Sequence, residues 1–440
     1  MNKEQPQKIG GWGRFQPIDA RVLEPGSAQD LARAIHLGGG GLIARGLGRS
    51  YGDSSLAPTL LSTRRLDHFL RFEASNGLLT CESGVSLDEI LRHFVPRGWF
   101  LPVTPGTRFV TIGGAIAGDV HGKNHQHAGS FSRHVTSLEL ILASGECLTV
   151  SPQHHRELFE ATCGGMGLTG IIKSATFALQ PIASSSILET RLKLPHLDAV
   201  LEAFDAAKDA TYSVAWIDCM ARGAHLGRSI LMLGEHCATG ELIAHSARQI
   251  PVPFDLPRFC LSSTTATLFN LLYYTKARRQ PQMRRVSYAP FFYPLDTLSH
   301  WNRLYGASGF VQYQCVLPQE AGAAGLKSIL KRVSALGEGS FLAVLKLLGP
   351  GNASPLSFPM QGYTLALDFR ATPEVLTCLN ELDQLIVDHG GRIALAKDAR
   401  MSQSTFRASY PRWESFEAIR HHYGAAGKFS SRQSQRLGLS

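Results

Sequence analysis

The sequence contains no CxxC pair of cysteines, no apolar run long enough to cross a bilayer and no nucleic-acid-binding motif. This scatter of cysteines argues against a zinc site or a disulfide framework and is typical of reduced thiols in a cytosol. The first residues, MNKEQPQKIGGWGRF, lack the apolar core of a signal peptide. We therefore expect a cytoplasmic protein. The eight cysteines are Cys81, Cys147, Cys163, Cys219, Cys237, Cys260, Cys315 and Cys378.

The composition is that of a globular protein. Hydrophobic residues make up 44% and charged residues 18% of the 440 positions, which suffices for two or three domains with cores of their own. Lysine and arginine outnumber aspartate and glutamate by 44 to 35, a net charge of +9. This mild excess suits anionic ligands or a membrane surface, and nothing in the chain suggests nucleic acid as a partner.

The stretch from Pro105 to Val135 is the most unusual part of the chain. It holds six glycines, four histidines and one acidic residue, Asp119. It is too broken for a helix and too polar for a buried strand. Glycine lets the backbone approach a flat or phosphorylated ligand closely and permits positive φ. We interpret the stretch as a backbone cradle for a large cofactor.

A second glycine-rich turn, RGLGRSYGD at residues 45–53, follows a short apolar strand expected at residues 41–45. Such a turn can point successive amides at phosphate oxygens. On its own, a short strand followed by a GxG turn favours an ordinary glycine turn over an anion site. A GxGxxG match at Gly165, Gly167 and Gly170 is not a dinucleotide fingerprint, because a helix precedes it and a strand follows, the reverse of the required order.

Periodicity divides the chain near Pro181. Before it, a helix capped by Ser27, a capping box opening at Ser86 and a hairpin around residues 144–146 are expected. After it, strands alternate with helices, which predicts an antiparallel sheet backed by helices. The strands are expected at residues 187–194, 212–218, 227–233, 310–317, 341–348 and 363–369. The helices are expected at residues 196–208, 319–336 and 373–389.

Residues 251–294 read as an irregular segment rich in apolar and basic side chains. Two interpretations stay open. One is a solvated loop with a basic face. The other is a lid that meets a phosphate-bearing or lipidic substrate, with peripheral contact at the inner face of the plasma membrane.

Several blocks of the chain resemble the vanillyl-alcohol-oxidase-type flavoproteins, and most closely the decaprenylphosphoryl-β-D-ribose 2′-oxidase family. The resemblance begins with RGLGRSYGD and TIGGAIAGDVHGKNHQHAGSF and covers nearly the whole chain. The later blocks are SVAWID at 213–218, FFYPLD at 291–296, WNRLYGASGFVQYQCVLP at 301–318, KLLGPGNASPLSFP at 346–359 and AKDARMSQSTF at 396–406.

The resemblance implies an α+β fold: a bipartite PCMH-type FAD-binding domain in residues 1–183 and 391–440, with a substrate domain inserted at 184–390. It implies that the 45–52 turn holds the FAD pyrophosphate and that residues 107–117 line the flavin. Arg49 stands where many relatives carry a flavin-linking histidine, so non-covalent FAD is expected. The cofactor-binding residues implied are Arg45, Gly46, Leu47, Gly48, Arg49, Ser50, Tyr51, Gly52, Gly106, Thr107, Thr111, Ile112, Gly113, Gly114, Ala117, His121, Gly167, Ile171 and Lys397.

Alcohol oxidation by a flavin needs a group that holds or removes the hydroxyl proton. Lys397, which the resemblance places over the flavin, is the first candidate; on residues alone it could be a surface lysine. Gln312 and Gln314 share one strand face. They could be two ligands of a sugar, or they could lie on a face that is exposed to solvent. Lys346 interrupts an apolar strand, which favours a functional charge. His121 is expected at the flavin or the substrate.

The spacing of His121, His125 and His127 could suggest zinc, but no thiol is near and we expect no metal. The resemblance implies oxidation of the 2′-hydroxyl of a polyprenyl-phosphate-linked ribose to a 2′-keto sugar, the first half of an epimerisation to arabinose. The partner would be a separate NAD(P)H-dependent reductase. The alternatives are oxidation of a soluble sugar, alditol or aldonolactone, and a non-catalytic ligand-binding protein on a flavoprotein scaffold.

Overall fold

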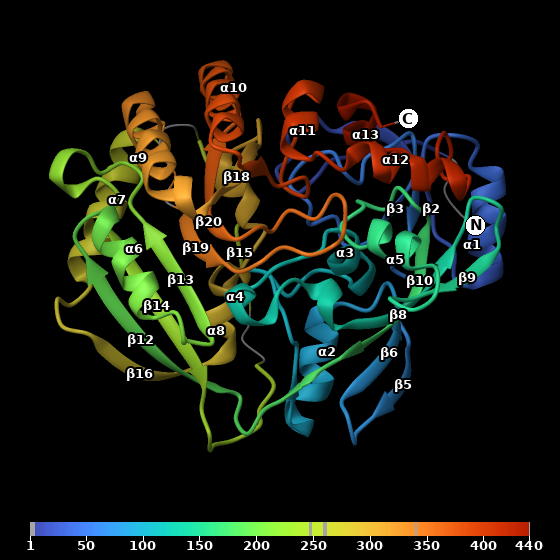
Figure 1. Cartoon of the computed structure of the whole chain (residues 1–440), viewed down its shortest axis with the longest axis horizontal. Coiled ribbons are helices and arrows are strands. Elements are labelled where there is room, and N and C mark those ends of the chain that lie inside the picture. Colours follow the sequence, from blue (N-terminus) through green and yellow to red (C-terminus); the bar gives the residue numbers. More distant parts are fainter. Residues whose placement is uncertain (1–4, 246–248, 258–261, 339, 341, 440) are drawn as a thin grey trace.

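The computed structural model describes residues 5–245, 249–257, 262–338, 340 and 342–439. It has the expected α+β architecture, with two halves side by side (Figure 1). No described helix is both long and apolar enough to span a bilayer. The segment between residues 105 and 135, expected to lack helices, forms two short ones, α3 (Ile112–Ala117) and α4 (His125–Ala128).

The first half is built on two sheets. The smaller sheet has the order β1-β2-β4-β3 and places the strand β3 beside β4 in parallel. The larger is antiparallel, with the order β5-β6-β10-β8-β9. The first sheet contains β1 (Gln7–Ile9), β2 (Ile18–Leu23), β3 (Leu42–Arg45) and β4 (Thr59–Ser62). The second contains β5 (Phe69–Glu73), β6 (Leu78–Glu82), β8 (Val135–Ile141), β9 (Cys147–Val150) and β10 (Ile171–Ala178).

The helices of this half begin where the sequence predicts. Ser27 caps α1 (Ala28–Leu37), and Ser86 forms a reciprocal capping box with Glu89 at the start of α2 (Leu87–Phe94). Side-chain oxygens at these positions satisfy amides that have no partner inside the helix. The sequence also predicts a short helix at residues 155–162, and the structure has α5 (Arg156–Thr162) there.

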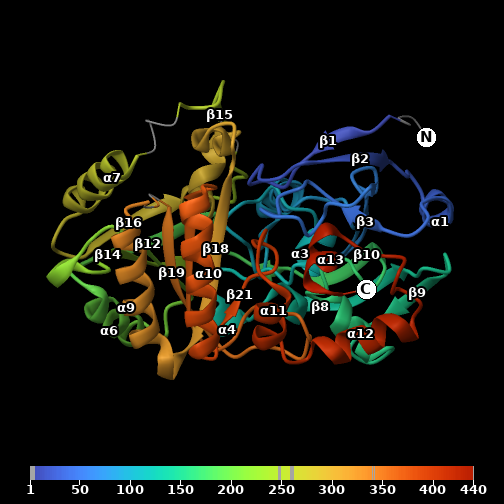
Figure 2. The ribbon, with the colours of Figure 1, turned by 90° about the horizontal axis from the view of Figure 1, so that it is seen from above.

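The second half is one antiparallel sheet with the strand order β16-β12-β14-β13-β19-β20-β18-β21. Helices α6 (Leu197–Ala206), α9 (Gln319–Leu336) and α10 (Pro373–Asp388) cover one face of it (Figures 1 and 2). The other face meets the first half through α4 and α8 (Tyr288–Phe292). The strands are β12 (Ser186–Leu194), β13 (Tyr212–Ile217), β14 (Ser229–His236), β16 (Gln282–Ser287), β18 (Phe310–Pro318), β19 (Ala343–Leu348), β20 (Gly362–Arg370) and β21 (Arg392–Ile393).

The chain leaves this sheet after β21 and passes through α11 (Gln403–Ser409), which contacts α10, β21 and α13. It then returns to the first half with α12 (Trp413–His422) and α13 (Arg432–Leu437) (Figure 1). Arg420 is fully buried and donates hydrogen bonds to the carbonyls of Leu168 and Phe429. Arg436 pairs with Asp53 and Asp398. The C-terminal segment is thus attached to the first half through a buried arginine and a half-buried one, each with polar partners.

Two local predictions are wrong. Residues 251–294 are not irregular throughout, because they contain the fourteen-residue helix α7 (Ser263–Lys276), the strand β16 and α8; residues 258–261 lie outside the described part. Alternation along residues 187–194 puts Glu189, Arg191 and Lys193 on one face and predicts a half-exposed strand, yet Glu189 is 2% exposed. The reason is pairing with β16, which brings Arg284 onto Glu189 beside Arg191.

Candidate active site

The glycine turn after β3 lies between two other segments. A Cβ on Gly46 would come within 2.3 Å of the Thr111 hydroxyl oxygen, and one on Gly52 within 1.7 Å of the Asp398 carbonyl. The Tyr51 amide also donates to the Ala396 carbonyl at 3.2 Å. Only residues without side chains fit these two approaches. The turn therefore touches the start of α3 on one side and the returning segment on the other.

The amides of this turn are available for an anion. Among the described residues, those of Leu47, Gly48, Arg49 and Ser50 donate to no protein acceptor. Gly48 has φ +63°, which lets successive amides converge. A ligand phosphate would satisfy them, so this part of the chain fits the pyrophosphate of FAD. Arg49 stacks on Trp12, 3.9 Å from the ring centroid, and burial lowers its pKa.

Arg45 does not point its charge at the turn. Its guanidinium donates to the carbonyls of Gly10 (2.8 Å) and Ser55 (3.2 Å) and to the Ser55 hydroxyl (3.0 Å). Its side chain also passes under Gly48, where a Cβ would lie 2.3 Å from a guanidinium nitrogen. Arg45 thus supports the turn from behind.

The second predicted cofactor segment is anchored at both ends. Thr111 caps α3 by accepting a hydrogen bond from the Gly114 amide, and the Gly113 amide donates to the Ser83 carbonyl. The amide of Arg108, next to Thr107, donates to Asp296 at 2.8 Å. A Cβ on Gly106 would meet no atom within 4 Å, Ile112 is fully buried, Gly114 is exposed and Ala117 is half-buried.

Gly167 and Ile171 lie farther along the same half. Gly167 has φ +79°, in the loop before β10. The Ile171 side chain is fully buried with Leu42 and Phe429, so only its backbone can face a ligand.

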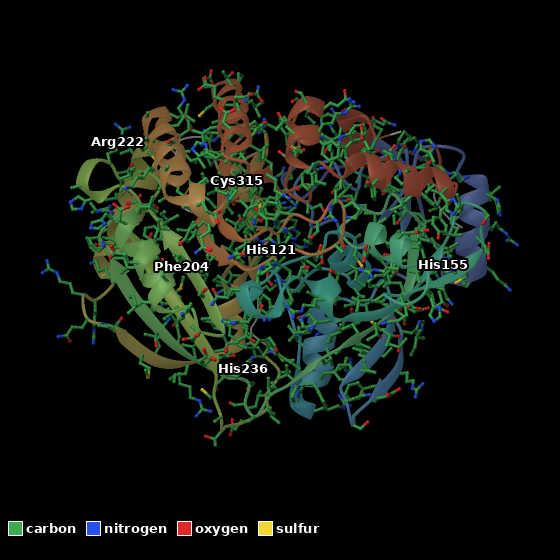
Figure 3. The ribbon with its side chains drawn as sticks, viewed as in Figure 1. His121, His155, Phe204, Arg222, His236 and Cys315 are labelled. Carbon is green, nitrogen blue, oxygen red and sulfur yellow. The ribbon has the colours of Figure 1, made fainter. Side chains whose placement is uncertain are left out.

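The five predicted catalytic side chains converge where the two halves meet. With Asp368 they form what we call the His121 cluster: His121, Gln312, Gln314, Lys346, Lys397 and Asp368. His121 lies between the halves (Figure 3). The Gln314 amide donates to Nε2 of His121 at 3.1 Å and to Thr364 at 3.2 Å. Because Nε2 accepts, the ring proton of a neutral His121 is on Nδ1.

Strand register explains why these side chains share a face. In the ladders, Gln312 lies opposite Asp368 and Lys346 opposite Thr364. Directly opposed residues of antiparallel strands point to the same side, and alternate residues repeat it. The polar positions of β18, β19 and β20 therefore form one surface, away from the core under α9 and α10.

Asp368 is buried at the centre of this surface. It accepts hydrogen bonds from the Gln312 amide at 2.6 Å and from the Tyr305 hydroxyl at 3.3 Å. Burial raises the pKa of its carboxyl to about 7, against the lowering effect of Gln312 and of the Lys397 charge. The Lys397 ammonium lies 3.9 Å from the ring centroid of Tyr51.

Burial sets the charge of the other cluster members as well. It lowers the pKa of Lys397 to about 8 and that of Lys346 to about 8. The pKa of His121 lies well below its usual value because of burial, followed by the charge of Lys346. His121 is therefore neutral at pH 7. The site holds lysines that can lose a proton near neutral pH beside a carboxyl that can accept one.

The structure adds one residue that the sequence did not single out, Asp368. It could have been found from the alternation of Thr364, Ala366 and Asp368 in an otherwise apolar strand. Lys123 is a candidate from the sequence because it lies in the glycine-rich stretch beside His121. It donates to the Phe291 carbonyl, and burial lowers its pKa to about 7, helped by the nearby Lys346 charge.

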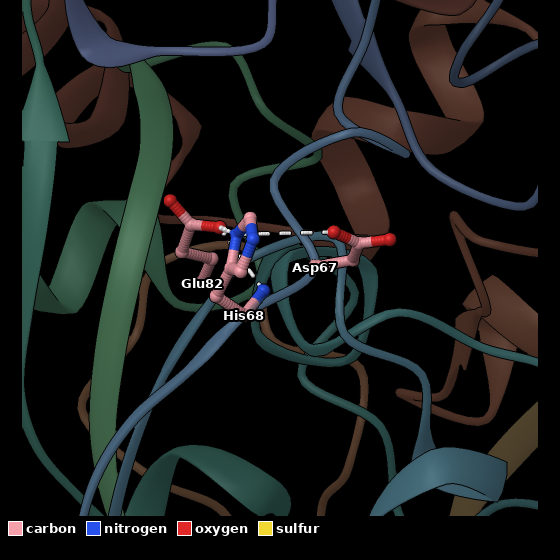
Figure 4. Close-up of side chains that lie close together, drawn as sticks. All are labelled: Asp67, His68 and Glu82. Atoms are coloured by element: carbon pink, nitrogen blue, oxygen red, sulfur yellow. Dashed lines mark hydrogen bonds and ion pairs between the residues drawn. The ribbon is translucent and has the colours of Figure 1, made fainter.

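The three histidines of the HxxxHxH spacing have separate partners. The Gly349 amide donates to Nδ1 of His125 at 3.1 Å, and Nε2 of His127 donates to the Ala210 carbonyl at 3.1 Å. Within the described ranges, the group that could hold a metal is elsewhere: Asp67, His68 and Glu82 (Figure 4). His68 is 72% exposed there and hydrogen-bonds Glu82 at 2.8 Å, as expected for a surface ion pair.

Comparison with known proteins leads to the same cofactor. An FAD-binding-domain family model matches residues 20–151. The chain is 37% identical to decaprenylphosphoryl-β-D-ribose oxidase of Mycolicibacterium smegmatis, over 98% of each chain. The chain belongs to this oxidase family. A Streptomyces coelicolor protein described as an uncharacterized protein in the mprA 5′ region is 34% identical over 81% of this chain and 100% of its own length.

A putative D-arabinono-1,4-lactone oxidase of Neurospora crassa is 28% identical over 39% of this chain and 32% of its own. That match covers less than half of the chain, whereas the decaprenylphosphoryl-ribose oxidase match covers both halves. The protein is an FAD-dependent oxidoreductase, and FAD is its cofactor.

Proposed function

We propose that this enzyme oxidises the 2′-hydroxyl of a polyprenyl-phosphate-linked ribose to the 2′-keto sugar. The observation that carries the proposal is the meeting of the two halves at the His121 cluster. There the side chains of β18, β19 and β20 face the segment that returns beside the glycine turn. The activity for which the Mycolicibacterium relative is named supports the substrate class.

The chain fits the cofactor in two places. The amides of residues 47–50 donate to no acceptor among the described residues and can bind the pyrophosphate, and the small residues of the capped α3 let the flavin come close to the backbone. In our proposal Lys397 belongs to both cofactor and substrate sites. Bound FAD would supply the acceptor for the hydride of the carbinol carbon. Because Arg49 occupies the position of the linking histidine, we expect non-covalent FAD, which acid precipitation would release quantitatively into the supernatant.

The protein's own residues then handle the hydroxyl proton and the sugar. Lys397 stabilises the developing alkoxide as a cation and, where its amine is neutral, takes the proton. Gln312 and Gln314 bind sugar hydroxyls, and their outer hydrogen bonds to Asp368, His121 and Thr364 fix how their amides point. Oriented amides of this kind hold a reacting carbon in place without moving charge themselves.

Lys346 and Lys123 are suited to the phosphate of the substrate. Burial lowers the pKa of both, and the Lys346 charge lowers that of Lys123 further. A phosphate anion beside them would offset that repulsion and restore both charges. A free pentose offers no such anion. This difference favours a phosphate-linked sugar over the soluble sugar, alditol or aldonolactone that remains the second candidate.

Anaerobic flavin reduction tests the proposal. The purified protein with its FAD is mixed with polyprenyl-phosphoribose, or in parallel with free ribose, an alditol and an aldonolactone, and flavin absorbance is followed. We expect bleaching by the phosphate-linked sugar at concentrations at which the free compounds leave the flavin oxidised. Equal bleaching by a free sugar would favour the second candidate. No bleaching by any compound would favour a non-catalytic binding protein.

Two partners belong to the same proposal. The keto sugar needs a separate NAD(P)H-dependent reductase to complete the epimerisation to arabinose. The lipid chain of the substrate suggests peripheral contact of residues 251–294 with a membrane, at its cytoplasmic face.

A further inference from the structure

Helix α7 lies at the outer edge of the half that contains the eight-stranded sheet (Figure 2). Its inner side is attached to the sheet. Asn270 is fully buried and donates to Asp218 at 2.9 Å, and the Tyr273 ring packs on Trp216 with centroids 4.8 Å apart. Tyr274 stacks under Lys193 and Arg228. The helix therefore has a fixed orientation, with one side defined as outward.

The middle of that outward side, residues 268–272, carries large apolar side chains. Leu268 is 54% exposed, Leu272 is 59% exposed, and Phe269 and Leu271 are also exposed. A surface helix normally turns charged or polar residues outward and its apolar stripe inward. Single exposed leucines are common in proteins, but three exposed leucines within five positions on one helix, beside Phe269, form an apolar patch of the kind that marks an interaction site.

The charged residues of α7 and of the sequence on either side of it have one sign. The sequence has no aspartate or glutamate between Asp255 and Asp296, although six lysines and arginines fall in that interval. Within the described structure, Lys276, Arg278 and Arg279 at the end of α7 are exposed and make no ion pair. An apolar helix side next to unpaired cations fits a surface that is apolar below and anionic above.

We propose that α7 and the basic residues that follow it, 276–279, form a docking surface for an anionic lipid bilayer. Leu268, Phe269, Leu271 and Leu272 enter the acyl boundary, and Lys276, Arg278 and Arg279 face the phosphate headgroups. This specifies the membrane contact that we proposed above. The absence of acidic residues from positions 256–295 of the sequence favours anionic lipid over a second copy of the chain, whose corresponding surface would carry the same positive charge.

Vesicle sedimentation tests the docking surface without involving catalysis. The FAD-loaded protein is spun with vesicles of phosphatidylcholine alone or mixed with phosphatidylglycerol, at low and high salt. We expect sedimentation with the anionic vesicles at low salt and its loss at high salt, because surface charges are screened. Replacing Arg278 and Arg279 by Gln should weaken binding to anionic vesicles about fivefold per residue.

The double variant Leu268→Glu/Leu272→Glu should lose vesicle binding. Its matched control is Leu37→Glu/Leu70→Glu, two similarly exposed leucines of the first half, which should bind as the parent does. Flavin content and melting temperature show that each variant is folded. Flavin reduction by detergent-dispersed substrate should be equal in all of them, which separates failure of docking from failure of the proposed activity.

Three results would overturn the proposal. The parent protein could stay in the supernatant with anionic vesicles, the Leu268→Glu/Leu272→Glu variant could bind vesicles as the parent does, or the Leu37→Glu/Leu70→Glu control could lose as much vesicle binding as the α7 variant. Light scattering tests whether a second copy of the chain covers this surface instead. A dimer that the α7 variant dissociates, with no vesicle binding by the parent, would assign the surface to self-association instead.

Discussion

At the scale of single residues, burial rather than sequence context controls the chemistry of the His121 cluster. The same loss of water lowers the pKa of Lys397 and Lys346 to about 8 and raises that of Asp368 to about 7. Each group can therefore change charge near neutral pH. Side chains that are ordinary in water become usable acids and bases because two halves of the molecule cover them.

Replacement of Lys397 by Met should separate catalysis from cofactor binding. The variant keeps the length of the side chain but loses its proton chemistry, so we expect bound FAD and a flavin-reduction rate at least about 100-fold lower. Because burial disfavours the ammonium, folding stability is lost as pH falls from 10.5 to the folded-state pKa of about 8. The variant should therefore be more stable at pH 7, by about 1–3 kcal/mol. Stopped-flow bleaching measures the flavin-reduction rate, and urea unfolding measures the stability.

The control is Lys331→Met on the exposed side of α9, which should change neither quantity. Undiminished flavin reduction in Lys397→Met would remove this lysine from the catalytic role.

Replacement of Asp368 by Asn should change the pH dependence of stability. The raised pKa means that the folded protein holds this proton more tightly than the unfolded chain does. The contribution of Asp368 is therefore full below about pH 4 and is lost as pH rises through about 7. Relative to the parent, the Asp368→Asn variant should gain about 2 kcal/mol between pH 5 and pH 8. Unfolding curves measured across that pH range test this, with Asp209→Asn as the control at an exposed position. The prediction is wrong if the free energies of unfolding of the parent and of Asp368→Asn change in parallel with pH.

At the scale of elements, the glycine turn acts as a spacer between α3 and the segment that carries Lys397. Its backbone touches both neighbours so closely that a methyl group does not fit at Gly46 or Gly52. The position of Lys397 therefore depends on a residue more than three hundred positions earlier. A change in the turn should therefore lower the rate of flavin reduction as well as weaken phosphate binding.

Gly52→Ala should push the returning segment away from the turn. Its Cβ would lie 1.7 Å from the Asp398 carbonyl oxygen, a backbone atom that cannot rotate aside. We expect a loss of stability of about 1–3 kcal/mol, with weaker FAD retention and slower flavin reduction. Gly26→Ala, whose Cβ would make only ordinary contacts at 3.5 Å, is the matched control. Normal flavin content and rate in Gly52→Ala would show that the turn does not set the position of Lys397.

At the scale of the whole molecule, the buried side chain of Asp119 connects the two halves by hydrogen bonds. Asp119 is 1% exposed and accepts hydrogen bonds from Ser130, from the Ser132 amide and, across the junction, from Asn352 and Ser357. Two of these donors come from the glycine-rich stretch and two from the loop after β19. The Asp119 side chain holds the loop of one half against the cofactor segment of the other.

Asp119→Asn should loosen this junction, because an amide presents one acceptor oxygen where the carboxylate presents two. Hydrogen bonds to a charged group contribute more than neutral ones, and an unpaired buried donor costs more again, so we expect a loss of about 2–4 kcal/mol. Thermal unfolding measures the loss, and proteolysis should cut first after residue 349. Asp19→Asn, an exposed change in the first half, is the control. Equal melting temperatures would mean that Asp119 does not join the halves.

Much of this arrangement could be predicted from the sequence where the signal is local. Ser27 and Ser86 mark their helices because a cap acts within three residues. The shared face of Gln312 and Gln314 follows from the twofold period of a strand. The face of Glu189 was predicted wrongly, because β16, almost a hundred residues later, supplies its partner Arg284.

The sequence by itself determined the glycine turn, the alternating faces of the strands and the family, since each depends on neighbouring residues or on long matching blocks. Only the tertiary structure decided that Asp368 pairs with Gln312 near Lys397, and that α7 turns leucines outward. Which strands pair, and which charges lose their water, depends on contacts between residues far apart in the chain, and no local pattern contains that information.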